Sequence, residues 1–189
     1  MGRSASIPFA DLRQPSEPLT LHFAADHEVP NNPRLPLIVY RGALRLDPAF
    51  DPAAIFEAAF AANGWGASWR NGIHPFRHFH TRAHEVLGIA RGAARVEFGG
   101  AAGRQLDIGA GDVAILPAGT GHKRLAQSAD LLVVGAYPET GGVDQKRAGE
   151  VDIARALATI AQVPDPVKDP VYGADGPLPA LWRAADRLA

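Results

Sequence analysis

Three histidines and one glutamate stand at spacings that suit a metal site. His78 and His80 are two residues apart, and on an extended strand that spacing turns both imidazoles to the same face, with Cα atoms roughly 7 Å apart. A tight connection at 81–83 leads to residues 85–89, an apolar segment typical of a second strand that returns beside the first. Glu85 then meets the two histidines, and the group can hold one metal ion.

His122 completes the ligand set. It follows a turn at Gly111, the short apolar strand 113–116 and a corner formed by Pro117 and Gly119. Three neutral imidazoles and one carboxylate suit Fe, Mn, Ni, Co, Cu or Zn, and leave one or two positions for water or substrate. A lone histidine on a strand is usually packed or solvated. Because that interpretation has to account for three histidines and one glutamate together at fixed spacing, metal binding is the better one.

Four neighbouring side chains are candidates for the pocket or for supporting the ligands: His74, Phe76, His84 and Lys123. The first two share the inward parity of the histidine ligands, so His74 can reach substrate at the mouth of the pocket and Phe76 can line it. In the strand that turns Glu85 inward, residue 84 points outward, which favours a supporting or surface role over direct ligation. Lys123 directly follows the last ligand. Trp65 and Trp69, in contrast, are expected in the core.

The spacing of the ligands resembles the two sequence motifs of the cupin superfamily. The first motif, G-x5-H-x-H-x(3,4)-E-x6-G, is matched without a gap by Gly72, His78, His80, Glu85 and Gly92. The second motif, G-x5-P-x-G-x2-H-x3-N, is matched by Gly111, Pro117, Gly119 and His122, whereas Ala126 stands where the motif has asparagine. That asparagine is not a metal ligand, so its absence leaves the expected site intact.

Further segments resemble the YjlB-like cupin family more narrowly. They are 29–36 (V-P-N-N-P-x-L-P), 65–73 (W-x3-W-x-N-G-I), 84–88 (H-E-V-L-G) and 169–178 (D-P-V-Y-G-x2-G-P-L). The resemblance extends from about Thr20 to Trp182, which is nearly the whole chain. It implies a double-stranded β-helix barrel, and it implies no particular substrate.

The composition is that of an ordinary globular chain. Its 189 residues suffice for one domain with its own core. A formal net charge of -1 gives no field that would attract a polyanion, so nucleic acid is not an expected partner. No apolar run suits a signal peptide or a membrane span, so we expect a cytoplasmic protein without a membrane partner. The absence of cysteine excludes disulfides and thiolate ligands.

Hydrophobic periodicity predicts an all-β chain with a few peripheral helices, arranged as a single jelly-roll barrel. Residues 1–18 are expected to form a flexible arm, 19–140 the barrel and 141–189 a helical tail packed on it, with helices near 151–161 and 179–188. Within the barrel, 51–63 is an expected inserted helix, because Asp51 can cap it and apolar residues follow at helical spacing. Turns recur about every eight to twelve residues elsewhere, as in a barrel. The expected strands are 19–23, 37–40, 66–70, 74–80, 85–91, 93–98, 104–108, 113–116, 122–126 and 131–137.

Two functions fit these expectations. The first is a metal-dependent enzyme of oxygenase, isomerase or decarboxylase type, which uses one divalent transition metal such as Fe, Mn, Ni or Zn to act on a small oxygen-rich molecule. The second is a non-catalytic protein that binds or senses a sugar or another small molecule. An acid or base in the pocket besides the four ligands would favour the enzyme. We also expect a homodimer, formed through the edge of the strand 19–23.

Overall fold

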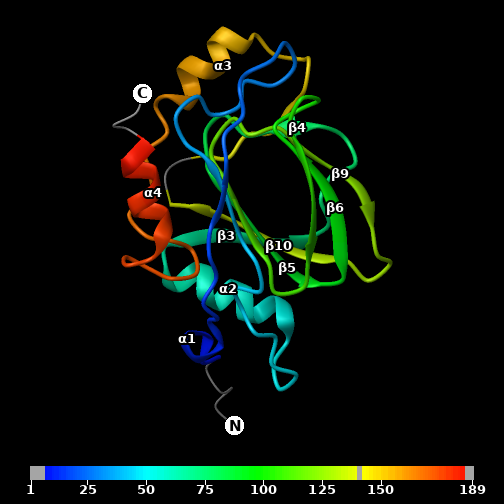
Figure 1. Ribbon diagram of the computed structural model, residues 1–189, viewed down its shortest axis with the longest axis vertical. Coiled ribbons are helices and arrows are strands. Elements are labelled where there is room, and N and C mark those ends of the chain that lie inside the picture. The colour runs from blue at the N-terminus through cyan, green and yellow to red at the C-terminus, as the bar shows by residue number, and fades with distance from the viewer. Residues whose placement is uncertain (1–6, 140–141, 186–189) are drawn as a thin grey trace.

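Two antiparallel sheets dominate the structure, a computed structural model that describes residues 7–139 and 142–185 (Figure 1). Six strands form the first sheet, in the order β1 (Leu19–Leu21), β2 (Leu37–Tyr40), β8 (Val113–Leu116), β5 (Glu85–Arg91), β10 (Leu132–Pro138) and β3 (Trp65–Asn71). Five strands form the second sheet, in the order β11 (Lys146–Arg147), β4 (His78–Phe79), β9 (His122–Gln127), β6 (Ala93–Phe98) and β7 (Arg104–Gly109). The predicted all-β class and jelly-roll arrangement are confirmed.

The strand β5 runs through the middle of the molecule with both faces buried. Leu87 and Ile89 point between the two sheets, where they pack in one cluster with Phe98 of β6. Val86 and Ala90 point the other way, into a second core cluster between the six-stranded sheet and the helices. Because neither face meets water, the sequence of β5 is a continuous apolar run and not an alternating one.

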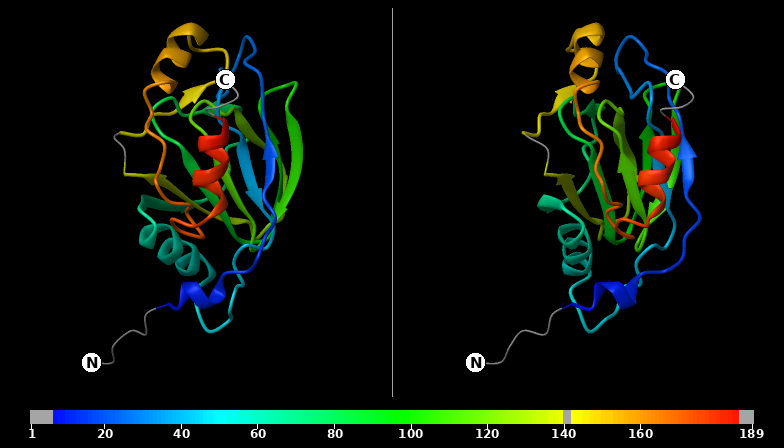
Figure 2. Two further views of the ribbon diagram at one scale, coloured as in Figure 1. Left: turned by 60° about the vertical axis from the view of Figure 1, so that its left-hand side comes forward. Right: turned by 90° about the vertical axis from the view of Figure 1, so that its left-hand side faces the viewer.

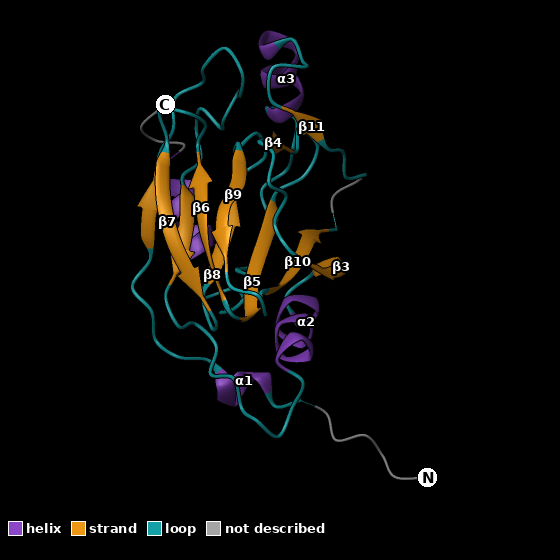
Figure 3. Cartoon of the chain, turned by 90° about the vertical axis from the view of Figure 1, so that its right-hand side faces the viewer, coloured by secondary structure: helices purple, strands orange, loops and turns teal. Residues whose placement is uncertain are grey.

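The helix α2 (Pro52–Ala62) packs beside β3, β5 and β10, at one end of the six-stranded sheet (Figure 3). Asp51 begins it, since its side chain accepts a hydrogen bond from Ala53 N at 3.2 Å, and the proline that follows suits the first helical position. The helix lies close to β5 because Gly88 has no side chain. A Cβ atom at that position would stand 2.3 Å from the Phe56 ring.

The C-terminal segment adds two more helices, α3 (Ile153–Ile160) and α4 (Pro177–Ala185). Figure 2 shows α4 lying along the six-stranded sheet, where Trp182 is buried and donates its Nε1–H to Pro36 O at 3.1 Å. The helix predicted at 179–188 thus begins two residues earlier, and residues 186–189 lie outside the described part of the chain. Among the described helices, none has the length and apolar character that a membrane crossing needs.

A buried carboxylate anchors the loop that leads into α4. Asp169 is fully buried and accepts a hydrogen bond from the Tyr40 hydroxyl at 2.5 Å. Its other oxygen accepts the backbone N–H groups of Val171 and Tyr172, at 2.8 and 2.9 Å. Gly176 leaves room for this arrangement, because a Cβ atom there would lie 2.4 Å from that of Asp169. The proline-rich tail is therefore an ordered part of the structure.

Two expectations need correction. The strand predicted over 74–80 is reduced to the two residues of β4. Pro75 has no N–H group to donate to a neighbouring strand. The carbonyl of His74 accepts an isolated hydrogen bond from Arg124 N at 2.9 Å, which is not part of a strand pairing. The N-terminal arm predicted over 1–18 is packed where the structure describes it. The helix α1 (Phe9–Leu12) buries Leu12 in the core, next to α2.

Candidate metal centre

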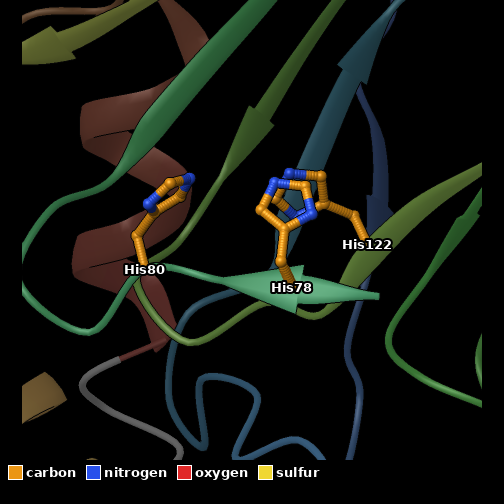
Figure 4. A group of neighbouring side chains, drawn as sticks. All are labelled: His78, His80 and His122. Atoms are coloured by element: carbon orange, nitrogen blue, oxygen red, sulfur yellow. The ribbon is translucent and has the colours of Figure 1, made fainter. Parts of the chain in front are cut away.

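Three buried histidines converge between the two sheets (Figure 4). His78 begins β4 and pairs directly with His122, which begins β9, and His80 follows β4 by one residue. Glu85, the first residue of β5, joins them from the six-stranded sheet. The exposed fractions of the four residues lie between 2% and 6%, so the cluster is almost completely removed from water. The structure thus brings together the four residues predicted as ligands.

Backbone carbonyl groups orient all three imidazole rings. The Nδ1 atom of each ring lies next to a carbonyl oxygen: that of Phe76 for His78 (3.3 Å), Asp144 for His80 and Thr120 for His122 (3.1 Å). A carbonyl only accepts hydrogen bonds, so in the neutral ring the proton resides on Nδ1. The lone pair of each Nε2 is then available, which is the state in which an imidazole binds a metal.

The remaining donor spacings fit one transition metal. Glu85 Oε2 lies 3.3 Å from His80 Nε2 and 3.4 Å from His122 Nε2, and one ligand atom from each histidine can be chosen within 4.8 Å of the others. Two donors at about 2.1 Å from a common metal, at tetrahedral or octahedral angles, stand about 3.0–3.4 Å apart. Among the described residues, the buried atoms His80 Nε2 and Glu85 Oε2 have no hydrogen-bond partner outside the cluster itself. A cation would satisfy both.

The charges within the cluster are set by burial and by proximity. Burial opposes the charged form of Glu85, but His80 and His122 beside it hold the pKa of the carboxyl well below its ordinary value. Burial also opposes a charged His80, yet the adjoining Glu85 raises the pKa of that ring to about 9. Burial, followed by the nearby His122, lowers the pKa of His78 to about 3. The metal-free cluster therefore holds an anionic carboxylate and a neutral His78, and His80 must release a proton to become a ligand.

A tyrosine and a tryptophan hold the carboxylate in place. The Tyr137 hydroxyl donates to Glu85 Oε1 at 3.0 Å, and Trp69 Nε1 donates to the Tyr137 oxygen at 2.9 Å. Since Oε1 is engaged, Oε2 is the oxygen that faces the histidines. Gly135 permits the arrangement, because a Cβ atom there would lie 2.1 Å from the indole ring. Trp69, predicted in the core, is only partly buried: it packs against the core cluster between the sheets and also lines the cavity.

Two polar anchors support the loops that carry the histidines. Asn31 Oδ1 accepts Gly121 N at 3.1 Å, and Asn32 Nδ2 donates to Ala118 O at 3.0 Å, so the Asn-Asn pair fixes the corner that precedes His122. On the other side, the Asp144 carboxylate accepts the backbone N–H and the hydroxyl of Thr81, at 2.8 and 2.7 Å. The histidine-bearing loops are therefore held by side chains more than 60 residues away in the sequence.

A cavity of about 670 Å³ opens onto the cluster. Of the predicted neighbours, His74 lines it, with its ring 4.9 Å from that of His78. Phe76 does not line it. Its ring lies under the Arg147 guanidinium, 3.8 Å from Cζ to the ring centroid. Lys123 points away from the cavity and pairs with Glu97 at 3.6 Å.

His84 lies on the far side of β5 from the cavity. It is 1% exposed, its Nδ1 accepts Ala118 N at 3.0 Å and its ring stands 4.7 Å from that of Trp182. The surface position allowed by the sequence is therefore wrong, because α4 covers this face. Burial lowers the pKa of His84 to about 4, so the ring is neutral at physiological pH.

Sequence reasoning missed several residues of the cavity wall. They come from four separate segments: Trp69 and Asn71, Arg124 and Gln127, Tyr137, and Gln145. Only Arg124 left a readable signal, since it follows His122 by two residues on β9 and so shares its face. The others reach the wall through strand pairings between distant segments, such as β3 with β10, which no local pattern specifies.

The two sheets and the cluster of three histidines and one glutamate between them define a cupin. The uncharacterized protein YjlB of Bacillus subtilis (strain 168) is 37% identical over 168 residues, which cover 88% of this chain and 97% of that protein. The chain therefore belongs to the YjlB family of cupins. No protein-family model matches it.

Solved structures resemble the chain more distantly. A conserved protein of Klebsiella pneumoniae with a double-stranded β-helix domain is 15% identical, with a TM-score of 0.37, over 78% of this chain and 93% of its own. Oxalate decarboxylase of Bacillus subtilis is 16% identical, with a TM-score of 0.36, over 78% of this chain and 34% of its own. Acireductone dioxygenase of Bacillus anthracis is 19% identical, with a TM-score of 0.36, over 48% and 62%.

Proposed function

We propose that His78, His80, Glu85 and His122 hold one divalent transition metal. The observation that carries the proposal is that the buried atoms His80 Nε2 and Glu85 Oε2 meet at a separation of 3.3 Å and have no hydrogen-bond partner outside the cluster among the described residues. In the metal-free protein a proton on His80 is what satisfies these two atoms, and a metal ion that replaced it would bind both of them together with the Nε2 atoms of His78 and His122. Nitrogen and carboxylate donors favour Fe, Mn, Ni or Zn.

We further propose that the metal-loaded protein is an enzyme that acts on a small oxygen-rich molecule. When bound, the metal supplies Lewis-acid polarisation of a substrate oxygen, or redox chemistry where it is Fe or Mn. The ligands are almost completely buried, and the cavity gives a small molecule access to them. Two groups with exchangeable protons, His74 and Tyr137, line the cavity next to the ligands, and their presence favours an enzyme over a protein that only binds.

Metal analysis of protein made without a histidine tag tests the first part. Cells supplemented with Fe, Mn, Ni and Zn should yield wild-type protein with about one equivalent of a single metal, measured by inductively coupled plasma mass spectrometry. Glu85→Gln should carry far less. Glu57→Gln removes a carboxylate that pairs with Arg70 on the surface and should leave the content unchanged. An empty wild-type site under all four supplements would overturn the proposal.

Turnover tests the second part. Loaded and chelator-treated protein are compared for oxygen uptake and product formation with small organic acids, phenols and sugars. The expected result is turnover of at least one class that depends on the metal and is lost in Glu85→Gln. A compound that binds tightly to the loaded protein and is never converted would show that the protein is a binding or sensing module.

A further inference from the structure

An arginine shares the cavity with the metal ligands. Along β9 the side chains alternate, so that His122 and Arg124 face the cavity while Lys123 between them faces away. The backbone of Arg124 is tied to the mouth of the cavity, since its N–H donates to His74 O at 2.9 Å. The position of Arg124 relative to the cluster is thus set by a two-residue step on one strand.

Only one edge of the guanidinium group is engaged. Nε donates to Ile73 O at 3.1 Å, which orients the planar group. Neither Nη atom has a partner within the residues that the structure describes. The side chain is partly buried and lines the cavity, so a ligand in the cavity can reach these donors. A guanidinium group whose Nε is held in place, and whose two Nη atoms both keep N–H donors available, is suited to an acceptor with two oxygens.

The described part of the cavity wall carries one positive and one negative side chain, and only the negative one is engaged within the metal cluster. Among the described residues that line it, Arg124 is the sole arginine or lysine and Glu85 is the sole acid. Because Glu85 is engaged with the histidines and Tyr137, it does not neutralise the guanidinium. A divalent metal in the cluster would give the wall an excess of positive charge. An anion is therefore the ligand that this wall favours.

The rest of the wall indicates what kind of anion fits. Apolar side chains form much of it, namely Ile73, Leu87, Leu131 and Leu132 together with the Trp69 ring, and the amides of Asn71, Gln127 and Gln145 complete it. No lysine and no second arginine is found among its described residues, whereas phosphate sites usually gather several cations or backbone N–H groups. A single planar fork next to apolar side chains suits a carboxylate.

We propose that the cavity binds a small monocarboxylic acid, with its carboxylate on the Arg124 guanidinium and a second oxygen directed to the metal. The assignment of Arg124 as the anion-binding residue rests on the cavity wall alone. The contact between the second oxygen and the metal rests on the proposed metal site. Arg124 thereby selects the substrate class: a carboxylate carried by a modest apolar body, in preference to a neutral analogue or a phosphate.

Matched pairs of anion and neutral amide test the proposal. Mandelate is compared with mandelamide, and benzoate with benzamide, by isothermal titration into metal-loaded and chelator-treated protein. Wild-type protein should bind at least one acid about tenfold or more tightly than its amide, as a charge-assisted bidentate pair provides. Arg124→Gln should lose that preference while keeping its metal content and melting temperature, and Arg124→Lys should retain part of it.

Arg95→Gln is the control, since Arg95 lies on the neighbouring strand and binds Asp107 through Nε at 2.8 Å, outside the cavity. If Arg124→Gln keeps the preference for the acid, the carboxylate sits on the metal and the inference fails while the metal site stands. If the metal is absent but binding of the acid still depends on Arg124, the metal proposal fails and this one stands. Binding of inorganic phosphate more tightly than every acid, or of no acid at all, would also overturn it.

Discussion

At the scale of single residues, two buried histidines on opposite faces of the same chain segment have opposite roles. His80 turns Nε2 toward Glu85, at 3.3 Å, and a backbone carbonyl holds its Nδ1. His84 instead accepts a hydrogen bond from Ala118 N and packs against Trp182. We expect His80→Ala to abolish metal binding and His84→Ala to spare most of it, measured by isothermal titration with Zn²⁺ and Mn²⁺.

The two variants also differ in stability. His84→Ala leaves the buried Ala118 N–H without an acceptor and opens a space beside Trp182, so its melting temperature should fall even though the metal still binds. The opposite pattern, in which His84→Ala is metal-free and His80→Ala binds, would mean that the strand register at Glu85 differs by one residue from the one described.

A second expectation concerns the hydroxyl behind the carboxylate. Tyr137→Phe removes the donor to Glu85 Oε1 and frees the carboxylate to rotate. Metal affinity should fall about 10–100-fold, as is common when a group that orients a ligand is lost. Tyr172→Phe is the matched control, because its hydroxyl bonds Gln14 O, 2.7 Å away, and does not line the cavity. Equal affinities for the two variants would show that Tyr137 does not orient the carboxylate.

The metal ligands could be predicted from the sequence because their spacing along the chain is regular. The residues that support them could not, because they meet only through the pairing of distant strands. His78 and His80 follow the two-residue period of a strand, and Glu85 and His122 stand at the spacings of the cupin motifs, so sequence patterns alone place all four. Tyr137 and Trp69 meet only because β10 pairs with β3 and Gly135 leaves space. No local pattern in either segment indicates the other, and the tryptophan was accordingly assigned to the core.

At the scale of elements, the close contact between β10 and Trp69 depends on a missing side chain. In Gly135→Ala the new methyl group would lie 2.1 Å from the indole ring, so the ring must move and release Tyr137. We expect a loss of about 1–3 kcal/mol in the free energy of unfolding, as for an overpacked core, measured by urea denaturation, together with a weaker metal site. Gly109→Ala, where the nearest atoms would be 3.9 and 4.0 Å away, should cost less than half as much.

Element prediction succeeded where the hydrophobic pattern was uninterrupted. The prediction of a strand at 85–91 matched β5 because the continuous apolar run is typical of a strand buried on both faces, and the helical stripe predicted at 51–63 matched α2. The segment 74–80 failed, because Pro75 and the engagement of the His74 carbonyl by Arg124 N interrupt the ladder. The same interruption places His74 and Arg124 together at the mouth of the cavity, so the irregularity contributes to the site.

At the scale of the whole molecule, assembly remains a prediction. β1 ends the six-stranded sheet, so its outer edge has no strand partner among the described residues, and Leu19 is 39% exposed there. An uncovered edge favours pairing with a second copy. We expect a dimeric mass by light scattering at micromolar concentration, and a monomeric mass for Thr20→Pro, which removes an edge N–H. A monomeric wild-type protein would contradict the expectation.

Metal binding should also couple the stability of the whole domain to pH. Burial disfavours a charged His80, but Glu85 raises its pKa to about 9, above an unfolded value near 6.5. The stability that the protonated ring gives the metal-free protein is therefore fully present below about pH 6.5 and is lost as the pH rises through about 9. The metal replaces that proton, so its stabilising effect changes in the opposite direction.

The rise in melting temperature caused by a fixed free concentration of Zn²⁺ should accordingly be small at pH 5, larger at pH 7.5 and larger again at pH 8.5, as measured by scanning calorimetry in metal-buffered solution. Titration at pH 7.5 in buffers of different ionisation enthalpy should show release of about one proton for each metal bound. Glu85→Gln removes both the metal ligand and the cause of the raised pKa, so its melting temperature should respond little to metal at any of these pH values. An equal rise at pH 5 and pH 8.5 would mean that the metal binds elsewhere on the chain, since no site that includes His80 can avoid competition with that proton.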